Sequence, residues 1–141
     1  SCIMGADYYE TNEHVVYPDA STRMCHVLGY YGLTHQYYNR YHLPMMLTET
    51  NESVEDDARH WLDRQWANVL RLRDEGFPIL GFTWYSLIDQ VDWDLGLREW
   101  RGRVNSFGLY DLDRKIRPAG EEYQRIVRDW QDLMAKSVIQ F

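Results

Sequence analysis

The hydrophobic pattern of the chain alternates between short apolar runs and longer amphipathic stretches. Short apolar runs, bounded by turn-forming residues, occupy residues 3–6, 43–47 and 79–86. Apolar side chains recur at intervals of three and four positions within residues 34–42, 54–70 and 123–134. Runs of the first kind are typical of buried strands, and the second spacing is that of a helix packed on one side. The sequence therefore predicts the order strand–helix three times over, which is an α/β fold with a parallel sheet.

The remaining segments are predicted to be less regular. Residues 11–28 are expected to be irregular, residues 89–106 to form a long loop, and residues 107–110 to add a short extra strand. Ser53 is expected to cap the second helix. A closed eight-stranded barrel typically needs about 250 residues, so three strand–helix units cannot close such a barrel alone.

Composition narrows the classes of partner. The formal net charge is -7 and the basic residues are not clustered, which argues against nucleic acid and anionic membranes. The 11 Tyr and 6 Trp supply aromatic faces of the kind that stack on sugar rings. Cys2 and Cys25 are too few for a disulfide scaffold, and we expect both to be reduced and buried.

Polar and aromatic side chains gather where the predicted strands end. Asp7-Tyr8-Tyr9 follows the first strand, Glu49 ends the second, and Trp84-Tyr85-Ser86 ends the third, with Asp89 beyond it. The carboxyl ends of parallel strands meet at one edge of a sheet. A carboxylate flanked by phenols and an indole suits carbohydrate chemistry, and a Tyr hydroxyl that bonds to the charged form is expected to keep the carboxylate ionised.

Four segments in order carry a resemblance to family 1 glycoside hydrolases, the β-glucosidase and 6-phospho-β-glucosidase family. Residues 44–51, PMMLTETN, resemble the strand that ends in the family's nucleophile, although Thr50 precedes Asn51 and no Gly follows. Residues 81–93, GFTWYSLIDQVDW, resemble the motif of the last strand without a gap. The segments FGLYD at 107–111 and GADYY at 5–9 are similar to the family's Phe-Gly-Leu segment and sixth strand.

The resemblance implies roles for individual residues. Glu49 would be the catalytic nucleophile, and Tyr9 the phenol that hydrogen-bonds it. Asp92 matches the family's sugar-binding Glu but is one methylene shorter, and Trp93 matches the Trp beside it.

The family's Trp of the last strand falls on Tyr85, while Trp84 lies one place earlier. Neighbouring residues of a strand face opposite sides, so only one of these two can line the site. Chemistry favours Trp84 and alignment favours Tyr85, which leaves both as candidate substrate-binding residues.

The fold implied by the resemblance is the C-terminal part, strands six to eight, of a (β/α)8 TIM barrel, with residues 1–141 as one segment. The family's acid/base Glu lies in an Asn-Glu-Pro segment, which this sequence lacks and which would lie upstream. We therefore expect a retaining glycoside hydrolase acting on β-glycosides, incomplete without the first five barrel units. A carbohydrate is the expected substrate, and no cofactor or metal is implied.

Two other interpretations stay open. The chain could be a non-catalytic sugar-binding or scaffold relative, which the altered turn after Glu49 and Asp92 favour slightly. It could also be an unrelated α/β domain whose partner is a protein. In each case three units leave strand edges unpaired, so we expect association with the missing barrel half, another chain or a second copy. The sequence does not identify the sugar.

Overall fold

The computed structural model describes residues 2–24, 27–52 and 55–136, which divide into two compact units. The first unit comprises residues 1–50 and 65–83, and the second comprises 51–64 and 84–141. Within the described residues, no helix is both long and apolar enough to cross a membrane. Ser53 and Cys25 lie outside the described residues, whereas Cys2 is exposed, so the expectation that it is buried was wrong.

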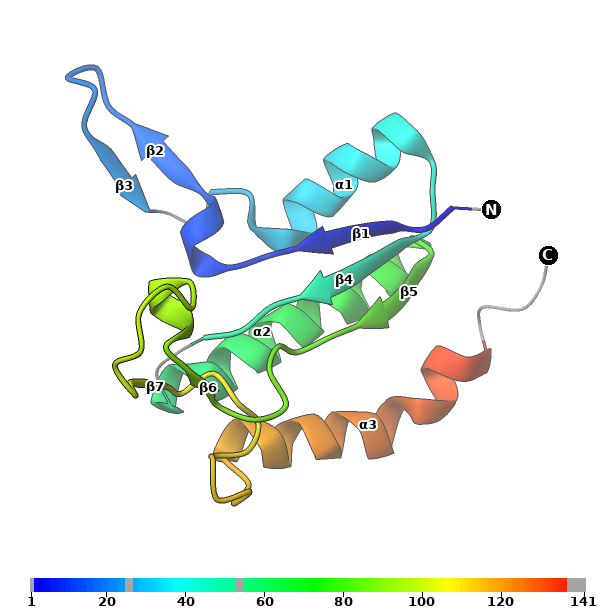
Figure 1. The fold of residues 1–141 in the computed structure, drawn as a ribbon. Helices are drawn as coiled ribbons and strands as arrows, with labels where there is room; N and C mark the ends of the chain where they lie inside the picture. Colours follow the sequence, from blue (N-terminus) through cyan, green and yellow to red (C-terminus); the bar gives the residue numbers. More distant parts are fainter. Residues whose placement is uncertain (1, 25–26, 53–54, 137–141) are drawn as a thin grey trace. The chain divides into compact units, whose positions relative to one another are not determined.

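The first unit contains a parallel sheet in the order β1-β4-β5. Its strands are β1 (Met4–Asp7), β4 (Met45–Glu49) and β5 (Ile79–Phe82), and their arrows point the same way in Figure 1. This confirms the predicted parallel sheet, which in the described part of the chain is open and does not close into a barrel. β5 stops at Phe82, so the prediction that this strand reaches Ser86 was wrong.

Two helices accompany this sheet. Helix α1 (Gly29–Tyr41) begins earlier than the spacing predicted and contacts β1's continuation through the rings of Tyr8 and Tyr30, whose centroids lie 6.2 Å apart. Helix α2 (Glu55–Asp74) is the clearest amphipathic stretch of the sequence. In its second half Val69 and Leu72 are fully buried, and the ring of Trp66 packs edge-on against Phe82 at 5.7 Å.

An antiparallel hairpin follows β1, where the sequence predicted irregular structure. After the 3-10 turn η1 (Glu10–Asn12), strand β2 (His14–Val16) pairs with β3 (Thr22–Met24). The Asp19 carboxylate closes the turn by accepting hydrogen bonds from the backbone N–H and hydroxyl of Ser21, at 2.9 and 2.6 Å. Most hairpin side chains are exposed, so burial imposes no alternating pattern on this segment.

The second unit is built from short elements and one long helix. Strands β6 (Gln90–Val91) and β7 (Val104–Asn105) pair antiparallel around the 3-10 turn η2 (Trp93–Leu95), and helix α3 spans Pro118–Lys136. The prediction of a plain loop over 89–106 was therefore wrong. The prediction of a strand over 107–110 was also wrong, because there only Tyr110 forms isolated bridges, to Ile88 and Ile116. The core of this unit includes Leu62, Trp84, Leu109, Ala119 and Ile126.

A buried ion pair fixes the segment around Gly108 within the second unit. The Asp89 carboxylate accepts a hydrogen bond from the Gly108 N–H at 2.9 Å and one from the Arg117 guanidinium at 2.6 Å. A Cβ at position 108 would overlap the backbone of Asp89 and Tyr110. Glycine is therefore required there because two backbone segments approach too closely for a side chain.

Candidate active site

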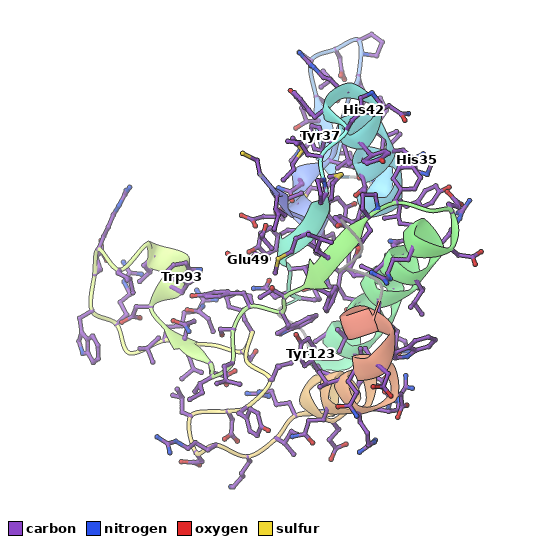
Figure 2. The ribbon with its side chains drawn as sticks, turned by 90° about the vertical axis from the view of Figure 1, so that its right-hand side faces the viewer. His35, Tyr37, His42, Glu49, Trp93 and Tyr123 are labelled. Atoms are coloured by element: carbon purple, nitrogen blue, oxygen red, sulfur yellow. The ribbon has the colours of Figure 1, made fainter. Side chains whose placement is uncertain are left out.

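Glu49 and Tyr9 lie together at the carboxyl end of the parallel sheet. Glu49 is the last residue of β4, and Figure 2 shows it at the end of that strand. The hydroxyl of Tyr9 donates a hydrogen bond to Glu49 Oε1. Both side chains are half-buried, so the carboxylate has a partner without being sealed off from solvent.

The backbone beyond β1 and β4 accounts for this juxtaposition. The N–H of Tyr8 donates to the carbonyl of Glu49 at 2.9 Å, and the Thr50 hydroxyl donates to the carbonyl of Tyr8 at 2.6 Å. Thr50 is fully buried and Tyr8 nearly so, so the two hydrogen bonds that join these segments lie in the core. The two strand ends are therefore held side by side, and Tyr9 follows directly from the fixed Tyr8.

The electrostatics of Glu49 differ from the sequence-based expectation. Burial raises the pKa of the Glu49 carboxyl above its ordinary value, and the nearby carboxylate of Asp7 raises it further. Asp7 is itself held by the hydroxyl of Thr48, which donates to Asp7 Oδ1 at 2.7 Å. The prediction that a Tyr hydroxyl keeps Glu49 ionised therefore misses the net direction, because loss of solvent and a like charge both favour the protonated form.

The candidate aromatic residues separate into one core residue and one accessible pair, all in the second unit. Trp84 is only 6% exposed, and its indole N–H donates to the carbonyl of Phe107 at 3.0 Å. Tyr85 is half-buried and its ring lies against that of Trp93, with centroids 5.8 Å apart and planes tilted by 46°. Trp93 is 45% exposed. It is the first residue of η2, where Figure 2 labels it. The accessible ring surface therefore belongs to Tyr85 and Trp93.

The carboxylate of Asp92 is hydrogen-bonded to the backbone of its own loop. It is 2% exposed, and its carboxylate accepts hydrogen bonds from the N–H groups of Arg101, Gly102 and Arg103 at 2.8–2.9 Å. Burial alone would raise the pKa of Asp92, but these three hydrogen bonds, with the charge of Arg101, hold it below the ordinary value. The carboxylate oxygens that the resemblance assigns to a sugar hydroxyl are therefore already bonded to the backbone of the loop.

The structure brings some predicted site residues together within each unit. Glu49 and Tyr9 are bonded in the first unit, and Tyr85 and Trp93 are in ring contact in the second. Sequence reasoning missed Asn105, whose side-chain carbonyl accepts the Trp93 N–H at 2.8 Å and helps to place that ring. A buried Asn twelve residues away leaves no local signal that would have revealed it.

Comparison of the sequence with known proteins finds a related protein and no matching family. No known family profile matches the chain. The galactolipid galactosyltransferase SFR2, chloroplastic, of Arabidopsis thaliana is 25% identical over 128 residues, which is 89% of this chain and 20% of that protein.

Solved structures of a β-glucosidase from Thermotoga maritima resemble this chain in three dimensions. The complex with deoxynojirimycin has a TM-score of 0.66 at 20% identity and covers 90% of this chain and 34% of that one. A structure titled as a family 1 β-glucosidase from the same organism gives 0.63 at 19% identity, with the same coverage. The chain spans about a third of these enzymes. It matches a fragment of a TIM-barrel β-glucosidase and thus has a glycoside hydrolase-like fold.

Proposed function

We propose that this chain supplies the nucleophile half of a retaining glycoside hydrolase that acts on β-glycosides. The observation that carries the proposal is the hydrogen bond from the Tyr9 hydroxyl to Glu49 at the carboxyl end of β4. The motif of residues 44–51 and the β-glucosidase-like fold support the same assignment.

In the proposed reaction Glu49 attacks the anomeric carbon and forms a covalent glycosyl–enzyme ester while the bond to the leaving oxygen breaks. An acid/base from outside this chain protonates that oxygen and then takes a proton from the water that hydrolyses the ester. Tyr9 positions the Glu49 carboxylate through its hydroxyl. Because only the ionised carboxylate attacks, the raised pKa of Glu49 restricts the reaction to pH values above it.

We further propose that Tyr85 and Trp93 provide the surface on which a sugar ring packs. Their rings are adjacent and Trp93 is exposed, whereas the indole N–H of buried Trp84 is already bonded. Alignment with the family had favoured Tyr85, and the exposure of this pair supports that choice. Asp92 is proposed to act on the sugar only indirectly, by fixing the loop next to Trp93.

Covalent labelling tests the nucleophile. Incubation with dinitrophenyl 2-deoxy-2-fluoro-β-glucoside, followed by intact mass and peptide mapping, should give an adduct on Glu49. The activated leaving group needs little help from a general acid, so the missing acid/base is not required. E49Q should give no adduct, whereas E10Q, which alters the exposed carboxylate directly after Tyr9, should be labelled like the parent chain. An adduct on another residue of the folded chain, or equal labelling of E49Q, would overturn the proposal.

The non-catalytic alternative makes a different prediction for the same variant. A sugar-binding relative would bind a β-glucoside without turnover, and E49Q would change neither property. Loss of labelling or turnover with retained binding in E49Q supports the enzyme.

Glycosyl transfer is a second candidate, favoured by the Arabidopsis relative, whose name describes a galactosyltransferase that acts with galactolipids. The same covalent ester would then be attacked by a sugar hydroxyl instead of water. Reactivation of the labelled chain by an added galactoside, faster than in buffer alone, would support transfer. Equal rates with and without the galactoside would exclude it.

We also propose that further polypeptide covers the outer edge of β1. Among the described strands β1 has β4 as its only neighbour. A cavity of about 530 Å³ lies beside it, lined by β1 and by a face of α1 that includes Tyr30, Leu33 and Tyr37. Unpaired strand edges associate readily, so the chain alone should self-associate, and sedimentation as a monomer at high concentration would count against this.

A further inference from the structure

The loop that connects β6 and β7 is firmly built yet presents apolar side chains to solvent. Trp100 is 89% exposed, Leu97 65% and Trp93 45%. Single exposed apolar residues are common on proteins, but several on one loop indicate a binding surface.

Backbone hydrogen bonds hold this loop in place. Its ends are joined by the β6–β7 ladder, and the Asp92 carboxylate binds the N–H groups of residues 101–103. The N–H of Leu97 returns to the carbonyl of Asp92 at 3.2 Å, and that of Gly96 to the carbonyl of Trp93 at 2.9 Å. The backbone on either side of Trp100 is therefore anchored next to Trp93, which reduces the entropy lost when a ligand binds.

The charges on the loop largely cancel one another. Arg101 pairs with Glu99, and the Arg103 guanidinium lies 2.7 Å from the Asp94 carboxylate. A surface of this kind provides little net field to attract a charged partner, so its contribution to binding is mainly apolar.

The size of the surface distinguishes between partners. An aromatic side chain buries about 150–250 Å² at most, so the exposed parts of Trp93, Leu97 and Trp100 amount to a few hundred Å². A stable protein interface needs about 800 Å² on each partner. The surface is therefore too small for a protein partner and matches a hydrocarbon chain better.

We propose that Leu97 and Trp100 bind the alkyl or acyl chain of a glycoside whose sugar packs on Tyr85 and Trp93. This inference rests on the proposed function and extends it, because it assigns the substrate to the glycosides that carry a long apolar aglycone. Burying only about two methylene groups is sufficient for a tenfold gain in affinity.

Calorimetric titration with methyl and octyl β-glucoside, the latter below its critical micelle concentration, tests the inference. The octyl glycoside should bind at least about tenfold more tightly than the methyl glycoside. W100A should remove that gain and leave the affinity for the methyl glycoside unchanged, while W93A should weaken both. L112A removes an apolar side chain of the second unit that is 48% exposed and lies outside the loop, so it should change neither affinity.

The possible failures are distinguishable. Methyl glycoside binding that W93A weakens, without an octyl gain, would overturn this inference and leave the proposed sugar surface standing. Octyl binding unaffected by W93A would show alkyl binding without sugar recognition and would also overturn the inference. If neither glycoside binds, both proposals fail. If W100A instead abolishes self-association and changes no affinity, the loop is a contact between copies and the inference is wrong.

Discussion

Glu49 in the first unit and Asp92 in the second are carboxylates at the ends of short strands, but their surroundings act in opposite directions. Burial raises the pKa of Glu49, and the nearby carboxylate of Asp7 raises it further, although the Tyr9 hydroxyl donates a hydrogen bond to this group. Asp92 is buried and accepts three backbone hydrogen bonds, so its pKa is lowered. Backbone N–H groups stabilise the ionised form of Asp92 and fix the loop around it, whereas burial and a like charge disfavour the ionised form of Glu49.

Asp89 in the second unit also holds backbone in place through its carboxylate, although burial raises the pKa of Asp89 as it does that of Glu49. Its side chain is 1% exposed and joins Arg117 and the N–H of Gly108. We infer that the second unit uses buried carboxylates to hold irregular backbone, while the first places one at a strand end beside a phenol.

The largest effect is expected for D89A. It leaves the half-buried guanidinium of Arg117 without this partner and the Gly108 N–H without its acceptor. Removing one member of a buried ion pair typically costs about 3 kcal/mol or more of unfolding free energy. Urea denaturation followed by tryptophan fluorescence should show this loss.

D113A is the matched control for D89A. Asp113 lies 3.9 Å from Lys115, and both side chains are about four-fifths exposed. Exposed pairs of this kind contribute little, so the denaturation midpoint should not move. Equal losses in D89A and D113A would contradict the structural role of Asp89.

A smaller and more local effect is expected for D92A. Without the carboxylate the N–H groups of Arg101, Gly102 and Arg103 lose their acceptor, and their hydrogen exchange should accelerate at least about tenfold. D94A breaks an ion pair of the same loop with Arg103 but no backbone hydrogen bond shown in the structure, and should leave that exchange nearly unchanged. Unchanged exchange in D92A would restore a free, sugar-facing carboxylate as the better interpretation.

The same contrast explains what the sequence could predict. The run before Glu49 predicts its strand because burial of Met45 and Leu47 makes the pattern visible. Parallel pairing of β1 with β4 predicts that residues 7–9 lie near Glu49. The choice of Tyr9 among them came from the resemblance to the family's sixth strand. Burial of a strand and parallel pairing of strands both produce a recognisable pattern of residue types in the sequence.

The role of Asp92 left no such trace. Its carboxylate oxygens accept hydrogen bonds from residues 101–103, which lie nine to eleven positions later. A loop with positive φ at Leu97 and Gly102 brings those residues back to Asp92. The hairpin β2–β3 was missed for a related reason, because its exposed side chains carry no burial pattern. Hydrogen bonds determine both features, and the spacing of hydrophobic residues does not indicate hydrogen bonds.

The smallest effect, and the sharpest test of the comparison, is expected for E49Q. Because the pKa of Glu49 is raised on folding, the folded chain binds more protons than the unfolded chain between the ordinary glutamate pKa and the raised value. The stability contributed by this group therefore falls as pH rises through that window. E49Q removes the loss, so at neutral pH the variant should unfold at a slightly higher temperature than the parent chain, and below the window the two should coincide.

Thermal unfolding of both chains across this pH range measures the difference. D7N should reduce it, since it removes the second cause of the raised pKa while leaving Glu49 in place. A parent chain that gains stability relative to E49Q as pH rises would mean that the Tyr9 hydrogen bond outweighs burial. Glu49 would then be a stabilised anion like Asp92, and the contrast between these two carboxylates would disappear.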